Sequence, residues 1–335
     1  MASIWAGTRV LFTGAQGFIG SWVAERLLDE EAELFVLDRP PAELSRFRLR
    51  GLHERCTPAP ADLLDPASLR RALDEHGIEA VFHLAATAIV GSATKSPLST
   101  YEVNVRGAWN LLEACRVADA PPQRVVVAST DKAYGTHEQL PYREDHALQP
   151  RYPYDVSKAC ADLIARSYAH TFGLPVAVTR FGNVFGGGDF NFSRLIPGTI
   201  KALLAGERPV IRSGGLMERD FLYAEDAADA YLAVAGSLDR HELRGRAWNA
   251  SIGSSVTVLE IVRRLAEIAG EGVEPDVRGE GTPHGELTSQ WLDSSAITEQ
   301  LGWTPAWDLE RGLEATYRWY EQELPRIAAL AQTAG

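Results

Sequence analysis

Five short runs of strand-forming residues alternate with amphipathic stretches along the first 182 residues, and this alternation constrains the fold more than any other feature. The runs are RVLFTG (9–14), ELFVLD (33–38), AVFHLAA (80–86), RVVVAST (124–130) and PVAVTRFG (175–182). Their nearly continuous hydrophobicity is typical of strands buried on both faces of a parallel sheet. Between them, Val105, Ala108, Leu112 and Cys115 follow the 3-4-3 spacing of a helix face. Strand and helix in alternation predict an α/β fold built on a doubly wound parallel sheet.

Beyond residue 182 the alternation weakens. The glycines of GGGDFNF (186–192) predict a loop, and helices are expected over 194–205, 225–236 and 256–270. The segment 208–223 is expected to form a strand, a turn and a second strand. This change of pattern predicts a smaller C-terminal substrate-binding region that is interleaved with the sheet.

Composition excludes several functions. The chain has 335 residues, of which 45% are hydrophobic and 23% charged, enough for one or two domains with a large core. Its formal charge of −12 argues against a nucleic-acid partner, because nucleic-acid-binding surfaces are basic. We find no signal peptide and no run of about 18 apolar residues, so we expect a soluble, cytoplasmic protein without membrane contact. The three cysteines lack metal-ligand spacing, so free thiols and no metal site are expected.

A glycine-rich loop joins the first predicted strand to the first predicted helix. GAQGFIG places Gly14, Gly17 and Gly20 at this junction, with Phe18 and Ile19 between them. Glycine permits a tight turn and lets the backbone approach a pyrophosphate that lies on the helix N-terminus. In this strand–loop–helix context the motif predicts a dinucleotide-binding loop of the Rossmann type.

Acidic residues after the next strands bear on the choice of dinucleotide. Asp38 ends the second predicted strand, where an acid binds the adenosine ribose hydroxyls. Arg39 follows directly and is suited to the 2′-phosphate of NADP, so both cofactors stay open, but the Asp38 carboxylate would repel that phosphate and favours NAD. Asp62 is either a contact to the adenine edge or a solvated loop acid.

A tyrosine and a lysine form the candidate redox pair. YPYDVSK places Tyr154 and Lys158 at i and i+4 on one helix face. The Lys158 ammonium and a positively charged nicotinamide are expected to lower the pKa of Tyr154 from its ordinary value of about 10. Tyr154 would then accept a hydroxyl proton while a hydride passes to NAD. Lys158 would also hold the nicotinamide ribose, and Thr130 would hydrogen-bond the reacting oxygen.

The order of these motifs resembles the extended short-chain dehydrogenases/reductases that act on nucleotide sugars. The likeness covers nearly the whole chain through GAQGFIG, HLAA, YDVSK, RFGNVFGGGD, RDFLYAEDAADAYL and LGWTP. Within that family the chain most resembles the sugar-nucleotide 4,6-dehydratases, particularly the CDP-glucose 4,6-dehydratase-like branch, through TDKAYG and GGGDFNFSRLIPGTIKALLAGERPVIRSGG. The resemblance implies NAD as a recycled cofactor and adds further residues to its site: Leu63, Leu84, Ala85, Ala86 and Asn104. It assigns 1–182, with about 220–250, to the NAD-binding Rossmann domain, and 183–219 and 251–335 to a nucleotide-sugar-binding region.

Asp131 and Lys132 distinguish the predicted reaction from simple epimerisation. The resemblance implies that C4 oxidation acidifies the C5 hydrogen, that Lys132 removes it, and that Asp131 protonates the departing C6 hydroxyl. Burial must then raise the pKa of Asp131, and burial or a nearby cation must lower that of Lys132. On an extended segment the two side chains would point to opposite sides. The alternative interpretation is an ion pair that caps the strand end.

The nucleotide-sugar end is expected to bind a diphosphate through arginine. By resemblance, the substrate-binding residues are Asn183, Arg194, Arg212, Arg219 and Arg278; for each arginine a solvated surface charge is the alternative. His83 is expected to be a packed strand-end residue, and residues 142–146 are expected to form a solvated loop. The family packs as homodimers through a four-helix bundle, which here would use helices at about 101–118 and 155–171.

Three functions stay open on the sequence alone. The first is a 4,6-dehydratase, a hydro-lyase. The second is an epimerase, reductase or decarboxylase of nucleotide sugars on the same scaffold. The third is a non-catalytic dinucleotide sensor, against which the intact set of Thr130, Tyr154 and Lys158 argues.

Overall fold

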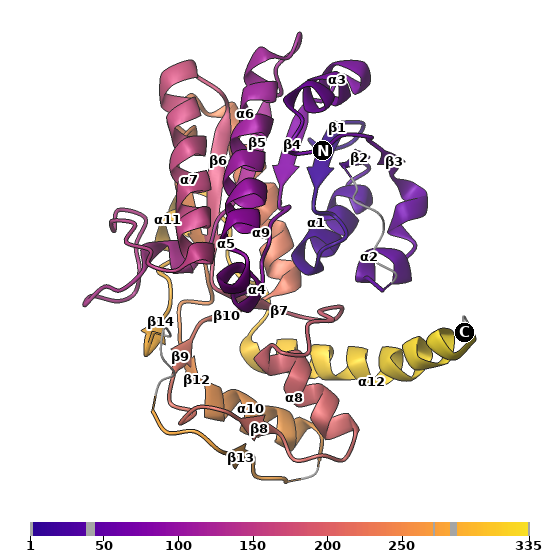
Figure 1. Cartoon of the computed structure of the whole chain (residues 1–335), viewed down its shortest axis with the longest axis vertical. Coiled ribbons are helices and arrows are strands. Elements are labelled where there is room, and N and C mark those ends of the chain that lie inside the picture. Colours follow the sequence, from indigo (N-terminus) through magenta and orange to yellow (C-terminus); the bar gives the residue numbers. More distant parts are fainter. Residues whose placement is uncertain (1–2, 38–43, 271, 282–286, 334–335) are drawn as a thin grey trace.

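A seven-stranded parallel sheet forms the larger part of the protein (Figure 1). The computed structural model describes residues 3–37, 44–270, 272–281 and 287–333. The sheet has the order β11-β6-β5-β4-β1-β2-β3, and every pairing in it is parallel. Its strands are β1 (Arg9–Thr13), β2 (Glu33–Leu37), β3 (Thr57–Pro58), β4 (Ala80–His83), β5 (Arg124–Ala128), β6 (Val176–Phe181) and β11 (Ala247–Ala250). The strand order reverses between β1 and β4, which is where ligands bind in open sheets of this kind.

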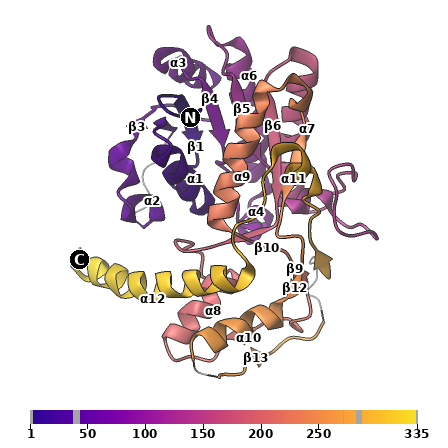
Figure 2. The ribbon, with the colours of Figure 1, turned by 180° about the vertical axis from the view of Figure 1, so that it is seen from behind.

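Helices cover both faces of the sheet and bury its apolar strands. One face carries α3 (Pro66–His76), α6 (Gly107–Val117) and α7 (Pro153–Phe172), and the opposite face carries α1 (Phe18–Asp29) and α9 (Ala224–Gly236). Figure 2 shows α9 and α1 side by side in front of the strands. The predicted doubly wound α/β sheet is confirmed. The sequence missed β3 and β11, because β3 has two residues and β11 carries a polar asparagine inside a short run.

A smaller region lies below the carboxyl edge of the sheet in Figure 1. Its core is formed by α8 (Leu195–Leu204), α10 (Val258–Ile268) and α12 (Leu309–Thr333). Short strands complete it: β7 (Asn183–Phe185), β8 (Val210–Ile211), β9 (Glu218–Arg219), β10 (Phe221–Tyr223), β12 (Val256–Thr257), β13 (Asp276–Val277) and β14 (Ser289–Gln290). The predicted helix over 256–270 begins only at Val258, because residues 256–257 pair with β9.

Short helices connect these elements. They are α2 (Arg46–Leu49), α4 (Val90–Lys95), α5 (Pro97–Tyr101) and α11 (Ser295–Leu301), the 3-10 turns η1 (Leu52–Arg55), η3 (Asp131–Tyr134), η4 (Ser237–Asp239) and η5 (His241–Leu243), and the π-helical turn η2 (Glu102–Arg106). Ile297 of α11 and Trp303 pack in the core cluster of the sheet. The predicted boundary at residue 251 therefore does not follow the packing at this segment. Among the described residues, none of the helices combines the length and the apolar character needed to cross a membrane.

Candidate active site

Three segments that carry predicted site residues lie at the carboxyl edge of the sheet. The glycine loop follows β1, Leu84–Ala86 follow β4, and Thr130 follows β5. These three strands are neighbours in the sheet, so their carboxyl ends open on the same edge. The smaller region lies directly beyond this edge (Figures 1 and 2).

The glycine loop is too crowded for any side chain at two of its positions. Gly14 adopts φ +84°, and a Cβ there would stand 2.6 Å from the backbone nitrogen of Ala85. A Cβ on Gly20 would stand 2.0 Å from the carbonyl oxygen of Gly14. Gly17 is the N-cap of α1 and has no side chain to cap the helix, so the first backbone N–H groups of α1 find no side-chain acceptor at the cap residue. A tight glycine turn that ends on an uncapped helix N-terminus fits a dinucleotide pyrophosphate.

The other predicted cofactor residues differ in how far they are buried and in whether they lie beside the glycine loop. Asp38 and Arg39 lie outside the described residues. Asp62 is exposed, and its carboxylate accepts a hydrogen bond from the Leu64 amide (2.9 Å), which makes it a turn-capping acid in this structure. Leu63 is buried, and Leu84, Ala85 and Ala86 are half-buried beside the glycine loop.

Asn104 joins two segments of the site. It lies on η2 and is buried, and its amide donates to the carbonyl oxygen of Thr87 (3.3 Å) and to the hydroxyl of Ser157 (2.9 Å). Its side-chain oxygen accepts from the Thr87 amide (2.7 Å). Because Ser157 precedes Lys158 on α7, Asn104 holds the loop after β4 against the helix of the candidate redox pair. Single-turn π-helices are frequent at functional sites.

Tyr154 and Lys158 lie on the first turns of α7, one above the other. The Lys158 ammonium donates to the carbonyl oxygen of Ala128 at the end of β5 (2.6 Å), and burial lowers the pKa of Lys158 to about 8. Burial, with the nearby Asp131 charge, raises the pKa of Tyr154 to about 12, although Arg194 and a hydrogen bond between the Thr130 and Tyr154 hydroxyls act the other way. The expected lowering was for a site that also holds the positively charged nicotinamide, and it stays a prediction; in the chain alone the pKa of Tyr154 is raised, because desolvation of the phenolate outweighs the charge of Arg194.

Thr130, Asp131 and Lys132 begin a 3-10 turn directly after β5. The Thr130 hydroxyl donates to the Asp131 carboxylate (3.0 Å) and accepts from the Lys132 amide (3.3 Å). Asp131 is 4% exposed, whereas Lys132 is half-buried and its ammonium has no hydrogen-bond or ion-pair partner within the described part of the chain. The chain is not extended at these two residues, because η3 starts at Asp131. The charges of Asp131 and Lys132 are therefore not separated by side chains that alternate between the two faces of a strand.

The electrostatics of Asp131 follow the predicted direction. Burial raises its pKa, while the charges of Lys132 and Arg219 and the hydrogen bond from Thr130 oppose the shift. A carboxyl group in such surroundings retains its proton more readily than one on the surface. The alternative was an ion pair between Asp131 and Lys132 that caps the strand end. The Lys132 ammonium makes no such ion pair in the described part of the chain, so its contacts do not support this alternative.

The predicted substrate residues divide into two groups. Arg219 is buried on β9, and its charge acts on Asp131; Arg194 caps α8, pairs with Asp189 (2.8 Å), and acts on Tyr154. Asn183 is half-buried at the start of β7. By contrast, Arg212 and Arg278 are exposed, and Arg278 is paired with Asp276 (2.7 Å).

Several buried polar residues near the site were not singled out from the sequence. Asp220 follows Arg219 and is 1% exposed. Tyr142 is also fully buried, and the half-buried Glu144 accepts from the backbone amide of Asn249 (2.9 Å). The expected solvated loop at 142–146 therefore holds for the exposed Arg143 and Asp145 but not for Tyr142 and Glu144. The acidic residues of that segment predicted a solvent-exposed loop. A buried tyrosine and a half-buried carboxylate cannot be recognised from the sequence, because hydrogen-bond partners such as Asn249 lie far away in the chain. His83 is buried as expected, with Nδ1 2.7 Å from the Thr13 hydroxyl.

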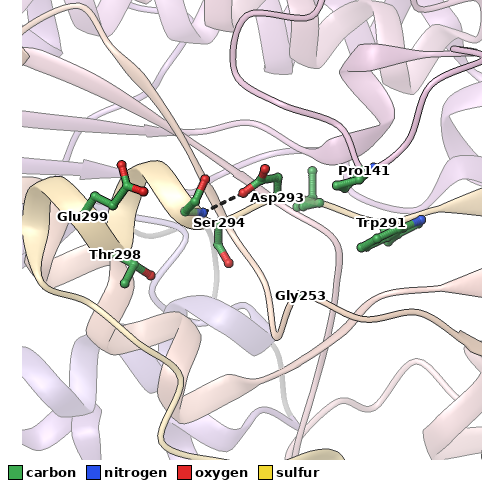
Figure 3. A pocket seen from close by; sticks show the side chains of 9 residues that line it. Pro141, Gly253, Trp291, Asp293, Ser294, Thr298 and Glu299 are labelled. Atoms are coloured by element: carbon green, nitrogen blue, oxygen red, sulfur yellow. Dashed lines mark hydrogen bonds between the residues drawn. The ribbon is translucent and has the colours of Figure 1, made fainter.

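Two surface hollows lie away from the predicted site residues. One of about 360 Å³ is lined by Pro141, Trp291, Asp293 and the first turn of α11, where the Ser295 amide donates to Asp293 (2.8 Å; Figure 3). A second, of about 630 Å³, lies between α10 and the start of α12. None of the predicted site residues lines either hollow. Chemistry and strand topology, not cavity size, locate the candidate site.

The parallel sheet, its glycine loop and the Thr130–Tyr154–Lys158 set define the class as an extended short-chain dehydrogenase/reductase of nucleotide sugars. A family model described as GDP-mannose 4,6 dehydratase matches residues 11–316, and the chain belongs to this family.

Named relatives include both dehydratases and epimerases. The CDP-glucose 4,6-dehydratase of Salmonella typhimurium is 31% identical over 95% of this chain and 92% of its own length. The dTDP-glucose 4,6-dehydratase DesIV of Streptomyces venezuelae, solved with NAD bound, has a TM-score of 0.83 and 30% identity over 95% of this chain and 98% of that one. A Thermotoga maritima UDP-glucose 4-epimerase, solved with UDP-glucose, has a TM-score of 0.85 and 27% identity over 95% of this chain and 100% of its own.

Proposed function

We propose that the protein catalyses the NAD-dependent dehydration of a nucleoside-diphosphate hexose to the 4-keto-6-deoxy sugar. The observation that carries this proposal is the buried Asp131 carboxyl, bonded to Thr130 and adjacent to Lys132, at the strand end that faces the Tyr154–Lys158 pair. Epimerisation needs no acid for a leaving hydroxyl, whereas elimination of water does. A carboxyl with a raised pKa is suited to that task.

The cofactor assignment rests on the glycine loop and on relatives with NAD bound. Gly14, Gly17 and Gly20 would hold the pyrophosphate, and Lys158 would hold the nicotinamide ribose. When bound, NAD would supply a hydride acceptor for C4 and a hydride donor for C6, so the reaction would have no net oxidation. The ring's positive charge would also lower the pKa of Tyr154, adding to the effect of Arg194, which burial outweighs in the chain alone.

The chain's own residues then divide the work between two steps. In the first, Thr130 orients the C4 hydroxyl and Tyr154 accepts its proton. In the second, Lys132 removes the C5 hydrogen as a proton while Asp131 gives its proton to the C6 hydroxyl, which leaves as water. A proton returned to C5 completes the 4-keto-6-deoxy product.

The diphosphate end is assigned to Arg219 and Arg194 first, because both act on the residues of the reaction centre. Arg212 and Arg278 are exposed in the structure and would approach the nucleotide from the outer side of the smaller region. Asn183 would contribute one further hydrogen bond to the diphosphate.

Product mass tests this proposal against its main rival. An epimerase reading has the support of the UDP-glucose 4-epimerase neighbour and of the shared Thr–Tyr–Lys set. Incubation with CDP-, dTDP-, UDP- and GDP-hexoses, followed by mass spectrometry, should reveal a product lighter by one water. A mass-neutral isomer from every substrate turned over would refute dehydration and favour the epimerase.

We further propose a homodimer in which α6 and α7 pair with the same helices of a second copy. Apolar side chains on these helices face solvent in the single chain: Trp109 is 44% exposed and Leu163 is 53% exposed. Two apolar helices side by side are a surface that a four-helix bundle would cover.

A further inference from the structure

A buried arginine beneath the candidate active site contacts residues from three other parts of the chain. Arg180, on β6, is fully buried, and its Nε and Nη2 donate to both carboxylate oxygens of Asp162 at 2.8 and 3.0 Å. Its Nη1 donates to the Tyr134 hydroxyl (2.9 Å) and, less closely, to the carbonyl oxygen of Glu144 (3.4 Å). The Tyr134 hydroxyl in turn donates to Oδ1 of Asn249 on β11 (2.8 Å). We call Arg180, Asp162, Tyr134 and Asn249 the Arg180 network.

The Arg180 network joins the two halves of the proposed catalytic machinery. Asp162 lies two turns after Tyr154 on α7 and one turn after Lys158. Tyr134 closes the four-residue turn η3 that begins with Asp131 and Lys132. The guanidinium therefore bridges the helix of the oxidation pair to the turn of the elimination pair.

A second tyrosine fixes the far end of the same turn. Tyr142 stacks on Tyr134 with ring centroids 4.9 Å apart, and its hydroxyl donates to the carbonyl oxygen of Gly135 (2.6 Å). Gly135 has φ +70°, and a Cβ there would stand 2.0 Å from the carbonyl oxygen of Gln149. The chain thus leaves η3 through a packed position with little freedom to shift.

We propose that Tyr134 and Arg180 are positioning residues that hold the Asp131–Lys132 turn in register with Tyr154 and Lys158. Neither of them is assigned contact with the substrate. The proposal rests on the proposed dehydratase function for its catalytic part, because elimination requires Asp131 and Lys132 to meet a substrate that Tyr154 has already oriented. In this fully buried ion pair every nitrogen of Arg180 and both oxygens of Asp162 have a hydrogen-bond partner, and such a pair holds its neighbours in one arrangement.

The test is Tyr134→Phe, which keeps the stacked ring and removes the hydroxyl that links Arg180 to Asn249. Tyr320→Phe is the matched control: Tyr320 on α12 is also fully buried, and its hydroxyl also donates one short bond, to the carbonyl oxygen of Asp189 (2.6 Å). Both variants lose one buried hydroxyl, but only one loses it beneath η3. Amide hydrogen exchange of residues 131–135 is measured in both, together with single-turnover rates of C4 oxidation and of water loss.

We expect Tyr134→Phe to speed exchange at 131–135 by on the order of 10-fold, while the control leaves it unchanged. Water loss should slow by on the order of 10-fold to 100-fold, because small displacements of catalytic groups are costly, and C4 oxidation should slow much less. Wild-type exchange at 131–135 in Tyr134→Phe, or equal slowing of both chemical steps, would overturn the proposal.

Two further outcomes keep the test decisive. If Tyr134→Phe does not fold, Asn249→Ala replaces it, since that variant removes the acceptor of the Tyr134 hydroxyl while leaving the Arg180–Asp162 pair in place; unchanged exchange and unchanged water loss in that variant would overturn the proposal. If wild-type protein removes water from no nucleotide hexose, the proposed function fails, but the exchange measurement still decides whether the network holds the turn.

Discussion

Asp131 combines burial, a hydrogen bond from Thr130 and a neighbouring lysine in one turn. At this residue the balance between burial and neighbouring charges decides whether the carboxyl keeps its proton. Lys132 and Arg219 favour the carboxylate, yet burial is the larger influence on the pKa and raises it. The same adjacency on an exposed turn would leave an ordinary surface ion pair of little consequence.

Asp131→Asn should abolish water loss while C4 oxidation continues, because an amide cannot protonate the leaving hydroxyl. Lys132→Ala should give the same separation through loss of the base. We expect water loss to fall by at least about 100-fold in each variant. Mass spectrometry of the product and single-turnover oxidation measure the two steps. Full dehydration by both variants would refute the assigned roles.

Asp220 provides a pH-dependent contribution to stability. Burial is the main cause that raises its pKa from 3.8 to about 7, and one of its carboxyl oxygens has no hydrogen-bond partner among the described residues. The folded protein therefore binds this proton more tightly than the unfolded chain. The resulting stability is present below the unfolded pKa and is lost as the pH rises through about 7.

Asp220→Asn should remove this dependence, because the amide stays neutral and its oxygen can still accept from the Leu292 amide. For one group the slope reaches about 1.4 kcal/mol per pH unit. Urea unfolding at pH values from about 5 to about 8 should show wild type losing stability relative to the variant as the pH rises. Parallel curves for the two proteins would contradict the prediction.

Among the elements, the glycine loop before α1 leaves no room for side chains at Gly14 and Gly20. The Gly20 position faces the carbonyl oxygen of Gly14 across the turn, and backbone cannot move away without opening the loop. The three glycines were recognised from their spacing, but the structural reason why glycine is needed is not the same at each position. Gly14 and Gly20 let two stretches of backbone meet, whereas Gly17 is the cap that leaves the helix N-terminus open.

Gly20→Ala should therefore lose NAD binding and several kcal/mol of stability, because the new Cβ overlaps a backbone oxygen that cannot be displaced cheaply. Gly91→Ala is the control. Gly91 lies in α4, no neighbouring atom lies within 4 Å of a Cβ built there, and alanine favours a helix. Calorimetric titration with NAD and thermal unfolding measure both effects. Wild-type NAD affinity in Gly20→Ala would contradict the assignment of this loop.

At the scale of the whole molecule, the loop predicted over 186–192 lies between the two regions. The Trp22 indole of α1 donates to the carbonyl oxygen of Gly187 (3.1 Å), and Trp319 of α12 packs against the same residue. Arg46 stacks over Trp22 with its guanidinium 3.7 Å from the ring. Aromatic side chains from distant parts of the chain thus meet at this loop and connect the sheet to the smaller region.

The proposed dimer makes a prediction at this same scale. Leu163→Glu would bury a charge in the four-helix bundle, and we expect it to give monomers at concentrations where wild type is dimeric. Ile4→Glu is the control, since Ile4 is equally exposed (53%) but lies outside α6 and α7. Sedimentation velocity decides between the outcomes. A dimeric Leu163→Glu, or a monomeric wild type, would exclude this interface.

The nucleotide preference is the remaining property of the whole molecule that can be measured directly. A ligand that binds only the folded protein stabilises it by RT ln(1 + [L]/Kd), so the preferred nucleotide should raise Tm most in a panel of CDP, dTDP, UDP and GDP. Arg219→Met should remove most of that shift, because a diphosphate would lose a buried cation. Equal shifts in wild type and variant would place the diphosphate elsewhere.

The sequence by itself determined the layered sheet, the glycine loop and the family motifs, because hydrophobic periodicity and short-range motifs are local properties of a chain. Tertiary structure alone decided that the pKa of Tyr154 is raised, and it built the network beneath the site. It also decided that Tyr142 and Glu144 of the acidic segment turn inward. Those outcomes depend on burial and on partners more than thirty residues away, such as Glu144 with Asn249, and desolvation is set only when the whole chain has packed.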